Sequence, residues 1–241
     1  MAYKARTYRS WTTSGGLVFF EVAEKETDLA IYATKDLSKQ ARGAVRTYRQ
    51  ELEDYIRRHP DFYSSLEPLP AGTDAPGIVK AMAEAGRKAG VGPMAAVAGA
   101  FAEFVGRDLL PLSDEVIVEN GGDIFLKTKE KRTLGIYAGE DSPFTGRLAI
   151  EVAPSEEGLG VCTSSGTVSH SLSFGKSDAI VILAHDAALA DAAATAAGNA
   201  LKGPGDIEKG IAVARSIDGV TGVLALVGDK MGSWGEIKLI S

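Results

Sequence analysis

One segment, HDAALADAAATAAGN at His185–Asn199, constrains the fold of this chain more than any other stretch. It predicts a helix made of Ala, Leu and Gly, with almost no side chain that would keep a helix surface in water. Such a helix has to be buried, and its small side chains allow a second backbone or a ligand to come close. Asp191, Thr195 and Asn199 are spaced four residues apart and therefore share one face of the helix.

Asp191 has two interpretations on so apolar a helix. A buried carboxylate needs a cation, a metal or several hydrogen-bond donors. In the structural interpretation, backbone N–H groups supply those bonds. In the functional interpretation, Asp191 and Thr195 offer oxygen atoms to a hard cation such as Mg²⁺. We expect the functional role, with Asp191 ionised. Because burial alone would raise its pKa, a nearby cation or several donors must then stabilise the charge.

A second helix of small residues is expected at Ala95–Val105, after Pro93, which suits the first turn of a helix. The rest of the chain alternates helical patterns with short β-branched strands, so the fold class is α+β. We expect one domain over residues 1–241, with a hairpin-plus-helix lobe at about 1–75. The other expected helices are Ser38–Arg58, Pro76–Lys88 and Ile207–Ser216, and the expected strands are Leu17–Val22, Asp28–Thr34, Glu115–Glu119, Asp123–Lys127, Thr133–Tyr137, Leu148–Val152, Gly160–Thr163, Ala179–Ala184, Gly222–Val227 and Glu236–Ile240.

A glycine-rich turn, Glu119-Asn120-Gly121-Gly122-Asp123, lies between two of these strands. Gly permits positive φ and lets a ligand approach the backbone closely. An isolated Asn-Gly-Gly is also typical of a type I′ hairpin turn with no ligand at all. We count Glu119, Asn120, Gly121, Gly122 and Asp123 as candidate ligand-binding residues.

A hydroxyl-rich loop, Thr163-Ser164-Ser165-Gly166-Thr167, leads to His170. Successive N–H groups and hydroxyls in such a loop can hold an anion, although many loops of this kind are simply solvated. Thr163, Ser164, Ser165 and Gly166 are therefore candidate ligand-binding residues. His170 is the candidate acid–base group, because an imidazole titrates near neutral pH.

Composition narrows the class of protein. The formal net charge is −6, and the sequence has no cluster of Lys and Arg that could bind a nucleic-acid phosphate backbone. A nucleic-acid partner is therefore not expected. Cys162 is the only cysteine, which agrees with a reducing compartment. The N-terminus lacks the apolar region of a signal peptide, and no run of about 18 apolar residues predicts a membrane span. We expect a cytoplasmic protein.

Three motifs follow one another along the chain: Glu119-Asn120-Gly121-Gly122-Asp123-Ile124, then Thr163-Ser164-Ser165-Gly166, then Ala190-Asp191-Ala192 with Thr195 one turn on. Their order and spacing resemble the ApbE-like flavin transferase superfamily over roughly Val91–Leu201. Members use FAD and Mg²⁺ to attach FMN to a Ser or Thr of a target protein. The resemblance implies a T-fold-related sheet, a metal held by Asp191 and Thr195, nucleotide contacts from the Asn120–Asp123 turn, and His170 loosely at the catalytic position.

The segment Val91-Gly92-Pro93-Met94-Ala95-Ala96-Val97-Ala98-Gly99 makes the chain similar to an uncharacterised ApbE-like family of archaea and anaerobic bacteria with a UPF designation. That family's gene associations imply a part in sulfide assimilation toward homocysteine, with a sulfur-metabolism protein as partner. Met94 joins the expected ligand-binding residues. Typical flavin transferases carry Gly-Gly-x-x-Lys-Gly at this place, and this chain has no Lys there, so we expect weak or absent FAD binding.

Three functions remain open from the sequence. The first is an ApbE-like protein that binds a small anionic or nucleotide-like ligand with Mg²⁺, as an enzyme or as an accessory in sulfide assimilation. The second is an FAD-dependent protein FMN transferase. The third is a non-catalytic ligand-binding or assembly protein. A homodimer is compatible with all of them.

Overall fold

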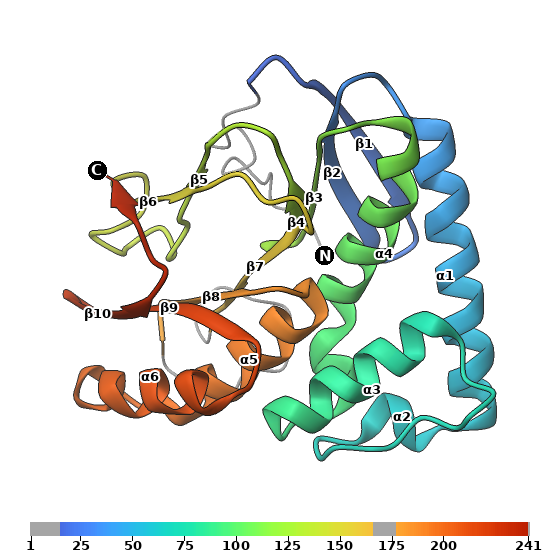
Figure 1. Cartoon of the computed structure of the whole chain (residues 1–241). Helices are drawn as coiled ribbons and strands as arrows, with labels where there is room; N and C mark the ends of the chain where they lie inside the picture. The colour runs from blue at the N-terminus through green and yellow to red at the C-terminus, as the bar shows by residue number, and fades with distance from the viewer. Residues whose placement is uncertain (1–14, 166–176, 241) are drawn as a thin grey trace.

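The computed structural model describes residues 15–165 and 177–240, and at its centre is an eight-stranded sheet (Figure 1). Every pair of neighbouring strands in this sheet is antiparallel. In spatial order the strands are β1 (Val18–Glu24), β2 (Thr27–Ala33), β3 (Val116–Asn120), β4 (Asp123–Lys127), β7 (Leu159–Ser164), β8 (Ala179–Ala184), β9 (Val220–Val227) and β10 (Lys230–Gly235).

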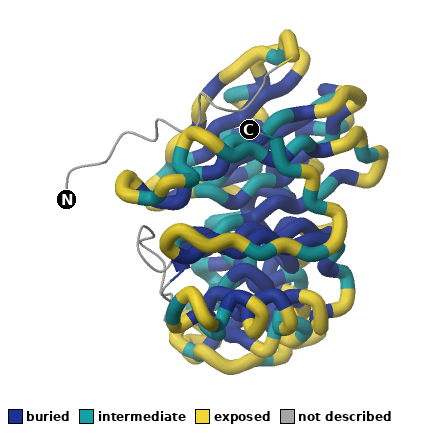
Figure 2. The backbone as a smooth tube through the Cα atoms, turned by 90° about the vertical axis from the view of Figure 1, so that its left-hand side faces the viewer, coloured by how far each residue is buried: buried dark blue, intermediate teal, exposed yellow. Residues whose placement is uncertain are grey.

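The central strands are apolar on both faces because both faces are covered. On β9, Val223 and Ala225 belong to the core under the helices, whereas Leu224 and Leu226 belong to a second core on the opposite face. This alternation follows from the two-residue period of a strand. The chain therefore builds three layers around two hydrophobic cores, and Figure 2 shows the buried backbone running through the middle of the molecule.

The helices form one layer. They are α1 (Ser38–Arg58), α2 (Asp61–Ser64), α3 (Gly77–Ala89), α4 (Val97–Leu109), α5 (Ala187–Ala200) and α6 (Ile207–Ser216), with the 3₁₀ turns η2 (Pro93–Ala96), η3 (Leu110–Leu112) and η4 (Pro204–Asp206). Most residues of α4 and α5 are buried, which confirms the prediction of two buried helices of small residues and the α+β fold.

The opposite layer is a small sheet of β11 (Leu239–Ile240), β6 (Ala149–Val152) and β5 (Arg132–Gly135), in that order. Its apolar side chains, such as Leu134 and Ile150, pack with Leu126 of the large sheet. The strand expected at Glu236–Ile240 is wrong for most of its length, because the edge strand is Lys230–Gly235. The sequence of β10, KMGSWG, lacks the β-branched residues that predict a strand. This segment becomes a strand because it pairs with β9.

The hairpin of β1 and β2 belongs to the large sheet, since β2 pairs with β3. Its residues Phe20, Val22 and Leu29 share one core with the central helices.

Among the described residues, no single helix is long and apolar enough to cross a membrane. Only the bent pair Gly77–Ala89 and Pro93–Leu112 passes that test together, and its two parts meet at 106°.

Candidate functional site

The glycine-rich segment forms the turn between β3 and β4. Asn120 pairs with Asp123, and the two central residues, Gly121 and Gly122, have φ of 69° and 107°. Positive φ at both positions is the backbone of a type I′ hairpin turn, so the hairpin interpretation of this motif describes its conformation correctly. The side chain of Glu119 reaches back, and its Oε1 accepts the Gly122 N–H at 2.7 Å.

The hydroxyl-rich segment begins beside this turn. Asp123 pairs with Cys162 across β4 and β7, and the backbone N–H of Thr163 donates to Oδ1 of Asp123 at 3.3 Å. A Cβ placed on Gly122 would lie 3.9 Å from the carbonyl oxygen of Thr163. The first two candidate segments are therefore neighbours, although forty residues separate Asp123 from Thr163.

The Ala-rich helix α5 lies along β7. A Cβ at Gly160 would come within 2.5 Å of the Cα of Ala187, so the two elements touch backbone to backbone. Further along, a Cβ at Gly198 would lie 3.6 Å from the hydroxyl oxygen of Ser164. Glycine on both elements thus brings α5 against the strand that leads into the hydroxyl-rich loop.

Asp191 faces the start of α4. Its Oδ2 accepts the backbone N–H of Gly99 at 2.9 Å, and the N–H of Ala98 also bonds to this carboxylate. The side-chain amide of Asn120 donates to the carbonyl oxygen of Ala98 at 3.1 Å. The first turn of α4 therefore connects the glycine-rich turn with the Asp191 face of α5.

The carboxylates at this junction have perturbed acidity. Burial raises the pKa of Asp191 to about 7, although the N–H groups of Gly99 and Ala98 lower it. Burial also raises the pKa of Asp123 well above its usual range, and the nearby charges of Asp191 and Glu119 raise it further. Two carboxylates whose charges repel each other at this junction favour a bound proton or a bound cation.

The thiol of Cys162 lies next to these acids. Its Sγ is 3.3 Å from the carbonyl oxygen of Ala187, and it also bonds to Asp123. Burial raises the pKa of this thiol well above its usual range, and the charges of Asp123 and Asp191 add to the effect. Cys162 is fully buried, and the raised pKa disfavours the thiolate, which is the nucleophilic form of cysteine.

The remaining predicted residues lie at three places. Thr195 is one turn beyond Asp191 on α5 and is partly buried. Ser164 and Ser165 are buried at the end of β7, and Met94 is partly buried in η2, just before α4. Gly166 and His170 lie outside the described residues, and so does the rest of the loop up to residue 176.

No group of three or more His, Cys, Asp or Glu side chains within residues 15–165 and 177–240 is arranged to hold a metal ion. A cation at Asp191 and Thr195 would therefore complete its coordination with backbone, water or ligand oxygens. That composition suits Mg²⁺, which binds through one or two carboxylates together with waters and phosphate oxygens.

Sequence reasoning missed three residues of this junction: Ala98, Gly99 and Glu103. Glu103 is the one acidic residue of α4 outside its last turn, in the otherwise apolar run VAGAFAEFVG, and it is buried. A lone carboxylate in a helix of that composition is a signal of a specific partner, by the argument that singled out Asp191.

The fold is similar to that of ApbE flavin transferases. The apo flavinyl transferase ApbE of Pseudomonas stutzeri superposes with a TM-score of 0.61 at 13% identity, covering 91% of this chain and 94% of its own. The flavin transferase ApbE of Vibrio cholerae gives 0.58 at 15% identity, covering 91% and 96%. At such identities the likeness establishes the fold class alone: an ApbE-like α+β protein.

Sequence comparison identifies the family within that class. A family model described as "AbpE bacteria" matches residues 9–225. A UPF0280 protein of Methanocella arvoryzae is 42% identical over 217 residues, which is 90% of this chain and 88% of that protein. One of Methanocaldococcus jannaschii is 42% identical over 219 residues, or 88% of each. The chain belongs to this UPF0280 family of ApbE-like proteins, and the likeness extends through the N-terminal hairpin and α1.

Proposed function

We propose that the protein binds a small anionic, nucleotide-like ligand together with Mg²⁺ at the junction of the β3–β4 turn, the end of β7 and α5. The observation that carries this proposal is the partly buried carboxylate of Asp191, which stands beside a second buried carboxylate, Asp123. Burial removes hydration from both carboxylates, and perturbed acids of this kind gather at functional sites.

The donor set suits a hard cation. Gly99 and Ala98 contact the Asp191 carboxylate from the α4 side. A carboxylate oxygen accepts more than one contact, and we assign Asp191 and the Thr195 hydroxyl to Mg²⁺. Bound Mg²⁺ would neutralise the phosphate charge of the ligand. The backbone of Gly121 and Gly122, and the hydroxyls of Ser164 and Ser165, are the groups we assign to the anion. Met94 and His170 are assigned to the same ligand by the family resemblance alone.

Protein FMN transfer from FAD is the second candidate function. The ApbE-like fold favours it, whereas the missing Lys in Gly92–Gly99 counts against it. A non-catalytic ligand-binding or assembly role is the third candidate.

A role in sulfide assimilation toward homocysteine, with a sulfur-metabolism partner in the cytoplasm, rests on the family resemblance. Growth of a deletion strain on sulfide as sole sulfur source tests that role, and unchanged growth would contradict it.

A thermal-shift screen tests the binding proposal. The purified protein is melted with ADP, FMN, FAD or inorganic diphosphate, each with Mg²⁺ and with EDTA. A ligand at 100 times its Kd stabilises a protein by about 2.7 kcal/mol. We expect at least one anion to raise the Tm in Mg²⁺ only, and Asp191→Asn to abolish that rise. Asp218→Asn, on a fully exposed side chain, is the matched control and keeps it. The absence of any Mg²⁺-dependent rise in the wild type would refute the proposal.

A further inference from the structure

Glu103 is a buried acid for which the proposed ligand site has no direct use. It stands on α4, and its side chain is 7% exposed. Its Oε2 accepts the backbone N–H of Ala187 at 2.8 Å and that of Ala188 at 3.4 Å. Both N–H groups belong to the first turn of α5, where helix geometry supplies no acceptor. Asp186, the residue before α5, makes no side-chain capping bond, so Glu103 takes that role from a neighbouring helix.

Asp191 of α5 caps the first turn of α4 in the same way. Ala96, the residue before α4, provides no side-chain cap, and Asp191 of α5 accepts the N–H groups of Ala98 and Gly99 in the first turn of α4. Each helix therefore supplies the carboxylate that caps the other. The two contacts lie one turn apart on each helix, between Gly99 and Asp191 and between Glu103 and Ala187. A movement of either helix start lengthens both sets of bonds.

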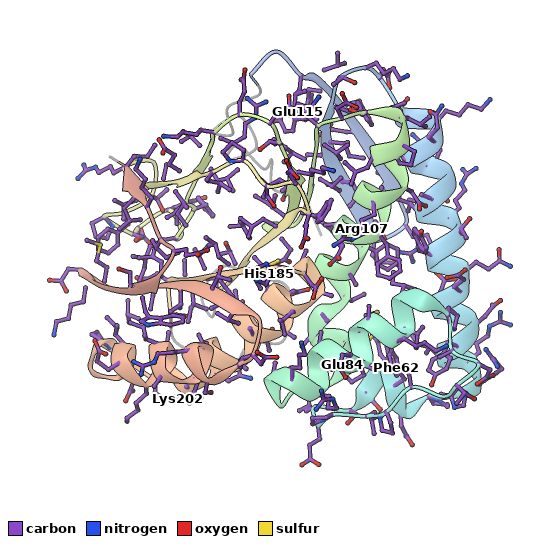
Figure 3. All side chains as sticks on the ribbon, in the orientation of Figure 1. Phe62, Glu84, Arg107, Glu115, His185 and Lys202 are labelled. Carbon is purple, nitrogen blue, oxygen red and sulfur yellow. The ribbon has the colours of Figure 1, made fainter. Side chains whose placement is uncertain are left out.

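Arg107 holds Glu103 in place. Its Nε donates to Oε1 of Glu103 at 2.8 Å, one turn along α4. Its guanidinium lies 5.1 Å from the ring centroid of Phe125 on β4, and 3.9 Å from the carboxylate of Asp186. Figure 3 shows Arg107 on α4 and His185 in the connection between β8 and α5. Arg107 thus fixes the Glu103 carboxylate at the point where α4, α5 and the sheet meet.

We infer that Glu103 is a positioning residue: by holding the first turn of α5 against α4, it sets where the Asp191 carboxylate stands in the ligand site. The inference deepens the proposed function and rests on it only for its effect on binding. It does not require Glu103 to touch the ligand. The expected signature is coupling: a change of the Glu103 side chain loosens the bond between Asp191 and Gly99, although that side chain bonds to Arg107, Ala187 and Ala188 instead.

Amide hydrogen exchange measures this coupling in the full-length protein without any ligand. Gly99 is the third residue of α4, so the helix offers its N–H no i−4 acceptor, and its protection reports the bond to Asp191. We expect Glu103→Gln, which keeps the size of the side chain, to speed exchange at Gly99 by about tenfold. Arg107→Gln, which keeps the Glu103 carboxylate but removes the Arg that holds it, should have a smaller effect in the same direction. Glu84→Gln is the matched control, because Glu84 also pairs with an Arg on its own helix but is exposed.

Binding is the second measurement. Mn²⁺, a paramagnetic substitute for Mg²⁺, is titrated into each variant in the presence of ADP and followed by the EPR signal of the free ion. We expect Glu103→Gln to weaken Mn²⁺ binding by roughly threefold to tenfold, about 0.7–1.4 kcal/mol. If the wild type binds no Mn²⁺, the proposed function fails, and Gly99 exchange still decides the positioning role. If Glu103→Gln changes exchange at Ala187 but leaves Gly99 exchange unchanged, Glu103 is a local cap only and the inference is wrong.

Discussion

The backbone N–H of Gly99 donates to the Asp191 carboxylate at 2.9 Å, and a Cβ at position 99 would lie 2.8 Å from the Cβ of Asp191 and 2.2 Å from the carbonyl oxygen of Ala187. Only glycine therefore fits where α4 crosses α5. Asp191 accepts the backbone N–H bonds that the structural interpretation of this residue required, and its role toward a ligand stays a prediction.

Gly99→Ala should destabilise the protein by about 1–3 kcal/mol, since the added methyl group forces the two helices apart. Chemical denaturation followed by circular dichroism measures the change. Gly43→Ala on α1 is the control, because a Cβ there has open space around it. We expect that variant to gain roughly 0.4–1 kcal/mol. Equal stability of Gly99→Ala and the wild type would show that the crossing is looser than described.

The stability of the metal-free protein should fall as the pH rises from about 6 to about 8. The pKa of Asp191 is raised to about 7 by burial, against about 3.9 for an ordinary Asp. The folded protein then holds this proton more tightly than the unfolded chain. The resulting stabilisation is complete below about pH 4 and is lost as the pH passes through about 7. Asp123 contributes in the same direction.

Melting curves across this range test the prediction. Asp191→Asn should flatten the pH dependence of the Tm, and Mg²⁺ should stabilise the wild type more at pH 8, where the carboxylate is ionised. A wild-type Tm that rises between about pH 6 and pH 8 without metal would contradict the acidity assigned to Asp191.

Thr195→Val removes one hydroxyl and keeps the shape of the side chain. Because Thr195 is partly buried one turn beyond Asp191, we expect the metal-free Tm to change little and the Mg²⁺-dependent shift to shrink. Thr47→Val on the exposed face of α1 provides the control for a Thr-to-Val change within a helix. If both variants respond to Mg²⁺ and ADP as the wild type does, Thr195 is not a ligand.

FAD should bind weakly. The segment Gly92–Gly99 contains no Lys, whereas typical flavin transferases carry one there. We therefore expect the protein to be colourless when purified and fluorescence titration with FAD to show no saturation at micromolar concentrations. A yellow preparation, or a low micromolar Kd for FAD, would restore FMN transfer as the leading function.

Local pattern predicted much of this fold. The burial of α4 and α5 followed from their small residues, and the β3–β4 turn followed from Asn120-Gly121-Gly122. The edge strand β10 could not be predicted in the same way, because Gly232 and Gly235 give it no strand propensity and its pairing with β9 is a tertiary contact.

The candidate site was harder to predict in full. Asp191 stood out because a carboxylate is rare on so apolar a helix. Its partners at Ala98 and Gly99 are backbone N–H groups, and no side-chain type in the sequence identifies such donors. Glu103 carried the same signal as Asp191 in a weaker form, since Arg107 one turn away made an ordinary surface ion pair equally plausible.

The most direct test of the account is a crystal structure of the protein grown with Mn²⁺ and ADP, with data collected at the manganese absorption edge. The account predicts one anomalous peak in contact with the Asp191 carboxylate and the Thr195 hydroxyl, with phosphate density on its far side near Gly121 and Gly122. Asp191→Asn crystals should lack that peak. A fully occupied manganese site elsewhere, with Asp191 bonded only to Ala98 and Gly99, would contradict the central claim that this carboxylate serves a ligand.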